Sequence, residues 1–316
     1  MLVTVSICTW NRSDLLHQTL RRMTEMTVPD GIEWELILVD NNSTDDTPGV
    51  VDRFDGLLPI RYIVEPQAGL SNARNTAVRH ANGTYVVWTD DDVLVDTGWL
   101  QSYVSAFKRY PDASIFGGPI LPWFEGDGPA WLHSVFRDVD VAYAVRDCGE
   151  IDSPMTESNM PFGANMGFRL SVLRERKFDP ELGRVAGGMR GGEETAMVGD
   201  LLSHGYEGRW LGGAKVQHFI PRVRQTTRYL WDWYAGYGSM LVRLDTKAAG
   251  MNARVRPRWI WREVIVSGSI FLWRRAWNGP SVWIGDLKRA AIASGQFREF
   301  GAQRDRARNV SGRPLD

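Results

Sequence analysis

The chain has 316 residues, of which 43% are hydrophobic and 24% charged, and its formal net charge is −1. This composition is typical of a soluble globular protein with one large or two small domains. Its two cysteines, Cys8 and Cys148, exclude a disulfide scaffold and a cysteine-based zinc site, and they favour the reducing cytosol.

The charge is unevenly distributed. Residues 251–316 contain 13 Lys and Arg against 5 Asp and Glu, a balance of +8, which leaves −9 for residues 1–250. A basic C-terminal quarter favours an anionic surface as a partner. Its longest uncharged apolar run, Val264–Trp273, is about half of the roughly 20 residues that a bilayer requires, so no integral membrane helix is expected. The N-terminus lacks the basic stretch of a signal peptide.

The first 120 residues alternate between strand and helix patterns. Strands are expected at Leu2–Cys8, Trp34–Val39, Ile60–Val64, Thr84–Trp88 and Ala113–Phe116. Helices are expected between them at about 13–23, 44–54, 70–80 and 97–109, with Ser13 as the cap of the first. This rhythm predicts an α/β fold with a Rossmann-type, mainly parallel sheet flanked by helices.

The later part of the chain is less regular. From Gly117 to Gly192 we expect functional loops rich in Gly, Pro and aromatic residues. A helix at Glu193–Ser203 and strands at Gly205–Leu211 and Ala214–Phe219 should follow. Beyond Pro221 the pattern is helical, which predicts one domain over 1–222 and a helical extension over 223–316. Seven of the 14 Trp follow residue 228 in this extension, and helix packing, sugar stacking and an anionic membrane surface are all open explanations for them.

The most informative segment is the run of Asp90, Asp91 and Asp92 at the end of a predicted strand. Adjacent carboxylates repel one another, and they make best sense where Mg²⁺ or Mn²⁺ neutralises them while substrate phosphates complete the coordination shell. The alternative is an acidic, solvated turn. In either case we expect the three carboxylates to face solvent.

Four segments at successive strand ends together carry a family resemblance. They are Thr9-Trp10-Asn11-Arg12, Asp40-Asn41-Asn42-Ser43-Thr44-Asp45-Asp46, Gly69-Leu70-Ser71-Asn72-Ala73-Arg74-Asn75 and the Asp triplet. In this order and spacing they resemble family 2 glycosyltransferases, which have the nucleotide-sugar-binding fold called GT-A. The resemblance covers about residues 1–220, including 162–169, 192–195 and 216–218.

The resemblance implies that these strand ends bind a nucleoside diphosphate sugar, with a UDP-sugar as the first candidate. Thr9 and Asp40 would face the nucleobase, and Arg74 would reach a phosphate or the base. The remaining donor-binding residues would be Asn11, Arg12, Asn42, Asp90 and Asp91. The alternatives are an Asx-turn at Asp40 and a solvated helix charge at Arg74.

The resemblance also implies a bound metal ion. Asp92 takes the place of the family's metal-ligating carboxylate, and His218 takes the place of a histidine that binds the metal in many members. Mn²⁺ or Mg²⁺ held there would bridge the two phosphates and neutralise the leaving diphosphate. For His218, a purely structural histidine is the alternative.

An acidic pair, Glu193 and Glu194, opens a predicted helix where the family has Glu-Asp, with the second carboxylate as general base. Glu194 takes that second place, but its longer side chain leaves open which of the two is the base, and helix capping is the alternative. One base without a nucleophilic carboxylate implies inversion at the anomeric carbon. Asn165 and Met166 would line the acceptor side, as the matching segment does in the family.

We therefore predict a metal-dependent, inverting glycosyltransferase that acts on a hydroxyl of a saccharide or lipid-linked saccharide, in surface polysaccharide biosynthesis. It would be cytoplasmic, or peripheral on the inner face of the membrane, and no nucleic acid is expected as a partner. Two alternatives are a nucleotidyltransferase of related fold, which would normally have a Gly-rich basic loop after the first strand, and a catalytically silent saccharide- or lipid-binding protein. A Rossmann dehydrogenase is disfavoured because no Gly-x-Gly-x-x-Gly follows that strand.

Overall fold

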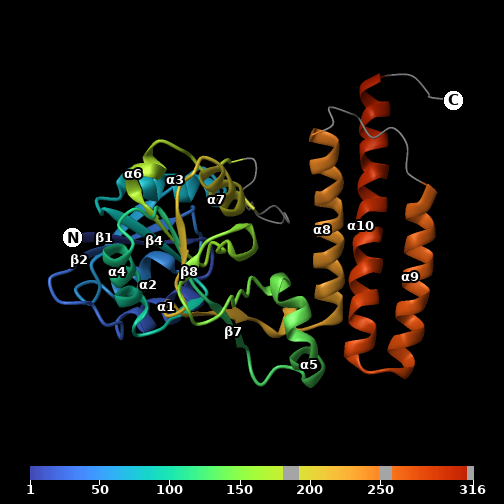
Figure 1. The fold of residues 1–316 in the computed structure, drawn as a ribbon, viewed down its shortest axis with the longest axis horizontal. Coiled ribbons are helices and arrows are strands. Elements are labelled where there is room, and N and C mark those ends of the chain that lie inside the picture. The colour runs from blue at the N-terminus through green and yellow to red at the C-terminus, as the bar shows by residue number, and fades with distance from the viewer. Residues whose placement is uncertain (181–191, 249–257, 312–316) are drawn as a thin grey trace. The chain divides into compact units, whose positions relative to one another are not determined.

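The computed structural model describes residues 1–180, 192–248 and 258–311 (Figure 1). The chain divides into two compact units. The first contains Met1–Trp123 and Tyr143–Phe219, and the second contains Phe124–Ala142 and Ile220–Asp316. The second unit thus includes residues 124–142, whereas the sequence predicts them in the domain over 1–222.

The first unit is built around an eight-stranded sheet with the order β3-β2-β1-β4-β9-β6-β10-β8. Its strands are β1 (Leu2–Thr9), β2 (Glu33–Asp40), β3 (Ile60–Val64), β4 (Tyr85–Asp90), β6 (Ile115–Gly117), β8 (Ser153–Pro154), β9 (Asn165–Arg169) and β10 (Gly208–Trp210). The pairs β1–β2, β2–β3, β1–β4 and β6–β10 are parallel, whereas β9 runs antiparallel to β4 and β6, and β8 to β10. The expected α/β fold with a mixed, mainly parallel sheet is confirmed.

Helices cover this sheet and bury their apolar faces against it. They are α1 (Ser13–Met23), α2 (Thr47–Asp52), α3 (Leu70–His80), α4 (Trp99–Arg109), α6 (Leu170–Arg174) and α7 (Glu193–Ser203). In α1 the buried side chains Leu16, Leu20 and Met23 follow helical spacing, which explains why this segment is a helix. Ser13 does not cap it, because Arg12 is the N-cap and the Ser13 N–H donates to Asp45 Oδ2 at 2.8 Å.

The expectation of loops throughout 117–192 is wrong at several places, of which two are the most informative. Residues 165–169 form β9, a buried strand in the middle of the sheet that contains Asn165 and Gly167, residue types that disfavour strands. Gly167 is required there because a Cβ would lie 2.9 Å from the Tyr103 ring. Residues 130–139 form α5 (Ala130–Val139), whose apolar spacing was hidden by the Gly and Pro residues just before it.

A second, three-stranded sheet of the first unit positions the histidine. Its order is β5-β11-β7, formed by β5 (Val93–Val95), β11 (Val216–Ile220) and β7 (Ile120–Phe124). β11 runs antiparallel to β5 with His218 opposite Val93, and the Phe219 N–H donates to the Asp92 carbonyl at 2.9 Å. The histidine is therefore fixed beside the Asp triplet by backbone pairing.

The second unit is helical, as expected for the C-terminal extension. It contains α5, the short 3-10 segments η1 (Asp140–Tyr143) and η3 (Arg222–Arg224), α8 (Thr227–Ala248), α9 (Arg258–Trp277) and α10 (Pro280–Ser311). α10 lies between α8 and α9, and it also contacts α5 (Figure 1). Within the described ranges, no helix combines the length and apolar character needed to cross a bilayer.

Candidate active site

The carboxyl ends of three neighbouring strands form one edge of the large sheet. β1 and β2 pair Thr9 with Asp40, and β1 and β4 pair Cys8 with Asp90, so these strand ends are level with one another. Ligands of open α/β sheets bind at such an edge. The polar residues predicted from the sequence to bind the donor are therefore gathered in one place.

Two loops at this edge interlock through asparagine side chains. Asn11 and Asn42 have positive φ angles of 51° and 66°, a conformation that Asn tolerates better than most residues. The Asn11 Oδ1 accepts from the Thr44 N–H at 2.7 Å, which ties the β1 loop to the β2 loop. Asn42 is exposed at the turn.

Asp40 is buried and already engaged. The Ser43 N–H donates to its Oδ1 at 2.8 Å, which is the Asx-type turn that the sequence left open, and the Tyr62 hydroxyl donates to its Oδ2. Burial and the Asp40 carboxylate raise the pKa of Tyr62 well above its usual value. The contact of Asp40 with a nucleobase stays a prediction.

The Asp triplet is not solvent-facing, so that expectation is wrong. Asp91 and Asp92 are each only 4% exposed, and Asp90 is half-buried. The turn after β4 packs under α1, where the Thr19 hydroxyl donates to the Asp91 carbonyl at 2.9 Å. The Thr9 hydroxyl donates to Asp91 Oδ2 at 2.8 Å, so Thr9 supports the triplet.

Arg12 supplies the positive charge that compensates these carboxylates. Its Nη1 lies 3.0 Å from Asp91 Oδ1 and 2.7 Å from Asp92 Oδ2. Burial raises the pKa of Asp91 to about 7, the Arg12 charge opposes that rise and the Asp92 carboxylate adds to it. The Arg12 side chain, predicted to bind the donor, is thus directed at the acidic cluster.

Asp92 and His218 together fit a divalent cation that is shared with a substrate. The His218 Nε2 lies 3.4 Å from Asp92 Oδ1, and both side chains are buried. The part of the chain that the structure describes has no group of three or more His, Cys, Asp or Glu that could hold a metal by itself. Mg²⁺ is commonly bound by one or two protein ligands, with phosphate and water oxygens completing its coordination shell. Mn²⁺ also accepts oxygen ligands together with one imidazole.

The second acidic pair lies at the start of α7, after Gly192 with its φ of 107°. Glu193 is buried, and its Oε1 lies 2.8 Å from Arg74 Nη1. Glu194 is different: its side chain is 17% exposed, and its Oε2 lies 3.7 Å from the same nitrogen. The helix N-terminus favours negative charge at both positions.

The structure places Arg74 in the interior, where it is surrounded by fixed groups. Its guanidinium lies 5.6 Å from the Phe178 ring centre, and a Cβ on Gly163 would be 2.0 Å from Nη2, so glycine makes room for it. Burial raises the pKa of Glu193 to about 7, while the Arg74 charge opposes the rise and Glu194 adds to it. The solvated helix charge considered for Arg74 is excluded, and its contact with a donor stays a prediction.

Asn165 and Met166 have fully buried side chains, and their place on the acceptor side stays a prediction. The Asn165 Oδ1 accepts from Trp99 Nε1 and the Tyr103 hydroxyl, both at 2.9 Å. Its Nδ2 donates to the carbonyls of Pro119 at 3.0 Å and Ala214 at 2.6 Å. Every hydrogen-bonding position of this amide is used inside the protein.

One residue in the first motif was not assigned from the sequence. Trp10 follows β1 and is 47% exposed beside the donor-side loops. An exposed Trp next to polar loops is the signal that could have marked it as a contact for a ring-shaped ligand.

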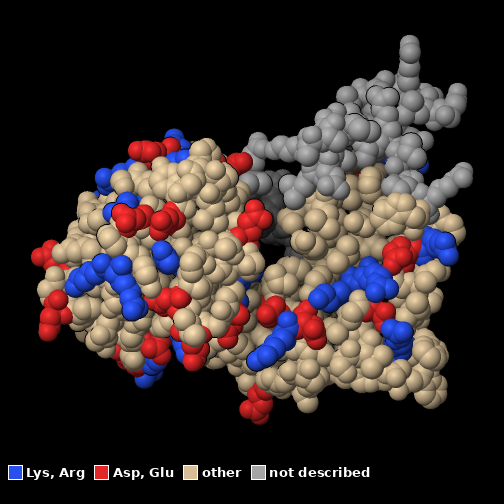
Figure 2. Space-filling model, in the orientation of Figure 1, with Lys and Arg blue, Asp and Glu red and all other residues tan. Residues whose placement is uncertain are grey.

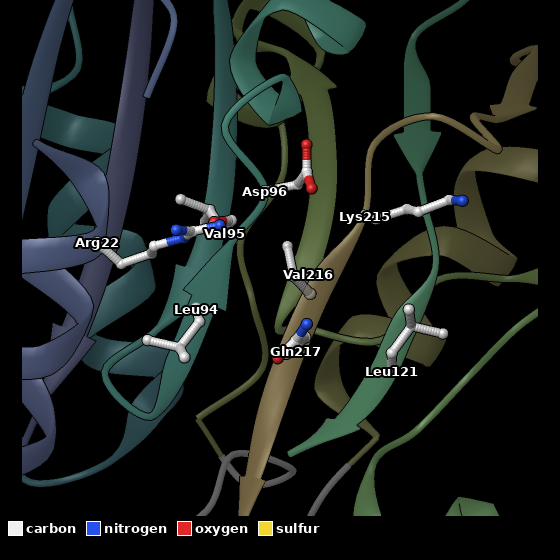
Figure 3. Close-up of a pocket in the computed structure, with 8 residues that line it drawn as sticks. All are labelled: Arg22, Leu94, Val95, Asp96, Leu121, Lys215, Val216 and Gln217. Carbon is white, nitrogen blue, oxygen red and sulfur yellow. The ribbon is translucent and has the colours of Figure 1, made fainter. Parts of the chain in front are cut away.

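A separate pocket of about 310 Å³ lies on the three-stranded sheet (Figure 3). It is lined by Arg22, Leu94, Val95, Asp96, Leu121, Lys215, Val216 and Gln217. None of the predicted site residues lines it. Its cations are already engaged, since Lys215 Nζ lies 2.7 Å from Glu150 Oε1 and Arg22 donates to the Val95 carbonyl.

The fold and the two acidic clusters together define a glycosyltransferase of the GT-A type. The family model Glycosyl transferase family 2 matches residues 4–176, which is more than half of the chain, and the chain belongs to this family. This membership confirms the resemblance seen in the four strand-end segments.

Curated relatives are of moderate similarity. The succinoglycan biosynthesis protein ExoM of Rhizobium meliloti is 26% identical over 233 residues, which cover 72% of this chain and 70% of ExoM. The validoxylamine A glucosyltransferase of Streptomyces hygroscopicus subsp. limoneus is 29% identical over 176 residues, covering 54% of this chain and 38% of that protein. The chain therefore spans well under half of the second relative.

Solved structures show the same fold. S. aureus TarS 1-349 in complex with UDP-GlcNAc aligns with a TM-score of 0.55 and 14% identity, over 95% of this chain and 92% of that one. The mannosyltransferase PcManGT of Pyrobaculum calidifontis, in complex with GDP-Man and Mn²⁺, aligns with a TM-score of 0.55 and 19% identity, over 99% of this chain and 88% of that one.

Proposed function

We propose that this glycosyltransferase moves a sugar, with inversion, from a nucleoside diphosphate sugar to a hydroxyl of a saccharide or lipid-linked saccharide. A UDP-sugar is the first candidate donor, and the pathway is surface polysaccharide biosynthesis. One observation carries the proposal: the two acidic clusters each pair with an arginine, yet only the strand-end cluster also has a histidine. One cluster suits a donor diphosphate, and the other suits proton removal.

The relatives support the substrate class. ExoM is named for succinoglycan biosynthesis, and TarS and PcManGT were solved with UDP-GlcNAc and GDP-Man. The two nucleotides differ in their base, so the fold alone is compatible with either. The choice of UDP therefore rests on the experiment below.

Glu194 is the proposed general base. Its carboxylate is partly exposed and lacks the close contact with Arg74 that holds Glu193. It would accept the proton of the acceptor hydroxyl as that oxygen bonds to the anomeric carbon and the bond from this carbon to the diphosphate oxygen breaks. Because this reaction uses a single displacement, the configuration inverts.

Asp92 and His218 are the proposed ligands of Mn²⁺ or Mg²⁺. A cation bound there would neutralise the charge that grows on the leaving diphosphate. Arg12 would keep Asp91 and Asp92 compensated and close together before the donor binds, because its Nη1 contacts both carboxylates. Asp90, Thr9 and Asp40 would position the nucleoside at the sheet edge.

A thermal-shift panel tests the donor and the metal together. We expect a UDP-sugar with Mn²⁺ to raise the melting temperature more than GDP- or dTDP-sugars, because a ligand that binds only the native state stabilises it by mass action. Chelation with EDTA should abolish both the shift and sugar transfer. Full transfer in EDTA, with the metal verified as absent, would remove the metal roles of Asp92 and His218.

The same panel separates the alternatives. A silent binding protein would show a shift without release of nucleoside diphosphate, and a nucleotidyltransferase would release inorganic diphosphate from a nucleoside triphosphate. We further propose that the protein acts in the cytoplasm, peripheral on the inner face of the membrane, because its C-terminal quarter carries a balance of +8.

A further inference from the structure

α9 has an exposed apolar face. Its side toward α10 buries Ile260, Ser267 and Phe271. The opposite side carries apolar residues that are 45% to 79% exposed: Trp259, Trp261, Ile265, Val266, Leu272, Trp273 and Trp277. Single exposed apolar side chains are ordinary, but a continuous row of this size marks an interaction surface. We call these seven residues the α9 face.

The structure separates the tryptophans of the extension into two groups. Trp283 is buried, and Trp231 and Trp233 are half-buried, so helix packing explains these three. The other four all belong to the α9 face. Packing within the unit therefore does not account for four of the seven tryptophans of the extension, all of them on the α9 face.

Charge at the α9 face is positive. Arg262 is exposed on the same side of the helix, whereas the Arg275 guanidinium lies over the Phe271 and Trp283 rings, on the side of α9 that packs against α10. Arg274 is paired with Asp286 at 2.9 Å, and Glu263 is half-buried at the margin. In Figure 2 the second unit shows charged side chains of both signs with broad uncharged areas between them. The positive charge thus flanks an apolar row and does not form a separate basic patch.

We propose that the α9 face docks the protein into the headgroup region of an anionic lipid membrane. The inference names the surface responsible for the peripheral membrane location proposed above. It rests on that location and not on the proposed reaction. Tryptophan is enriched at membrane interfaces, and arginine beside apolar surface pairs with lipid phosphates. A helix of 20 residues is about 30 Å long, so it presents its row along the membrane plane.

Charge argues against a second copy of the chain as the occupant. In a parallel two-fold pairing of α9, Arg262 of one copy would lie opposite Arg262 of the other. This arrangement brings two arginines together at an apolar contact, which is costly, whereas anionic lipid neutralises them. An antiparallel pairing is an outcome of the test below.

Co-sedimentation of the full chain with vesicles tests this surface. The probes are phosphatidylcholine vesicles and vesicles with one quarter phosphatidylglycerol. The variant is L272S/W273S/W277S, which removes three exposed apolar side chains of the α9 face. The matched control is L57S/I151S/V223S, which removes three equally exposed apolar side chains elsewhere. We expect the variant to lose at least about tenfold in binding to anionic vesicles and the control to bind like the wild type.

Two further readouts decide the outcome. R262Q should weaken binding to anionic vesicles and reduce its salt dependence. No binding to either vesicle, equal binding to both, or equal loss in variant and control would overturn the proposal. The proposal would also be overturned if the wild type were a dimer in solution and L272S/W273S/W277S were a monomer. The thermal shift with the nucleotide sugar should be the same in all variants, so a failure at the membrane is distinguishable from a failure of the proposed chemistry.

Discussion

Two clusters of the first unit contain the same groups, one arginine and two adjacent carboxylates, yet they are built differently. At the strand ends, Arg12 contacts both Asp91 and Asp92, and its own side chain is 37% exposed. At the start of α7, Arg74 is 3% exposed and contacts Glu193 at 2.8 Å while Glu194 lies 3.7 Å away.

The two arginines differ in whether another positive group could take over the compensation of the carboxylates beside them. Arg12 reaches solvent, so a cation and a diphosphate can take over the charge compensation of its carboxylates. Arg74 is fixed in the interior, so it holds Glu193 closely and leaves Glu194, the proposed base, without a close cation. The environment of two adjacent acidic residues thus depends on how deeply the arginine beside them is buried.

The largest expected effect separates the two glutamates. Glu194→Gln keeps the shape but cannot accept a proton, so turnover should fall by about 10²–10⁴-fold. The matched change Glu193→Gln should retain most of the turnover, because that carboxylate faces Arg74. Initial rates at saturating donor and acceptor measure both. If Glu193→Gln is the inactive variant and Glu194→Gln is active, the base is one residue earlier than proposed.

The next effect concerns the buried ion pair. Glu193→Leu leaves the Arg74 charge buried without its close partner, which should lower the free energy of unfolding by about 3–5 kcal/mol. Urea unfolding at pH 8 measures this. The double change Glu193→Leu with Arg74→Met removes both charges and should recover most of the loss.

The control for that pair is an exposed one. Asp46 and Arg53 are 2.7 Å apart and both well exposed, so Asp46→Leu should cost about 1 kcal/mol or less. Equal losses for Glu193→Leu and Asp46→Leu would show that Arg74 has no special dependence on Glu193.

A smaller effect is expected at the strand-end cluster. Asp92→Asn removes a charged metal ligand but can still accept from Arg12, so the fold should persist. Donor affinity with Mn²⁺ should fall by about 10–100-fold, measured by calorimetric titration. Asp112→Asn removes the same charge from an exposed position and should leave affinity unchanged. Unchanged affinity in Asp92→Asn would exclude this carboxylate as a ligand.

The smallest effect is a pH dependence of stability. The pKa of Glu193 rises from 4.5 to about 7 on folding, so the native state binds a proton that the unfolded state releases at lower pH. The resulting stabilisation is complete below pH 4.5 and is lost as the pH rises towards 7. Between pH 4.5 and 7 we expect the unfolding free energy of the wild type to fall relative to that of Glu193→Gln. Parallel pH profiles would contradict the raised pKa.

Much of the fold follows from local patterns in the sequence. β1 and β2 are short segments rich in Val, Ile and Leu, and α1 has regular helical spacing of its apolar residues, so each could be predicted without its neighbours. β9 could not be predicted in this way. A buried asparagine is stable in a strand only when distant residues form hydrogen bonds with its amide, and a glycine only when distant residues pack against it. Tertiary contacts override local propensity there.

The same limit applies to the site. Strand ends gave the position of the acidic residues, because parallel strands bring their carboxyl ends to one edge. The partners of Arg12 and Arg74 could not be predicted, since an arginine side chain is long and its direction depends on which cavity the fold leaves open. Gly163, far away in the sequence, provides the space that admits Arg74.

Asn165 has a consequence for the synthesis of the chain. Its four hydrogen bonds reach Trp99, Tyr103, Pro119 and Ala214, which are spread over more than one hundred residues. Chains emerge from the ribosome N-terminus first and begin to fold as they emerge. The early βα units can therefore form during translation, but this amide is satisfied only after Ala214 has emerged. The junction of the two sheets, and with it the placement of His218 beside Asp92, is completed late in biosynthesis.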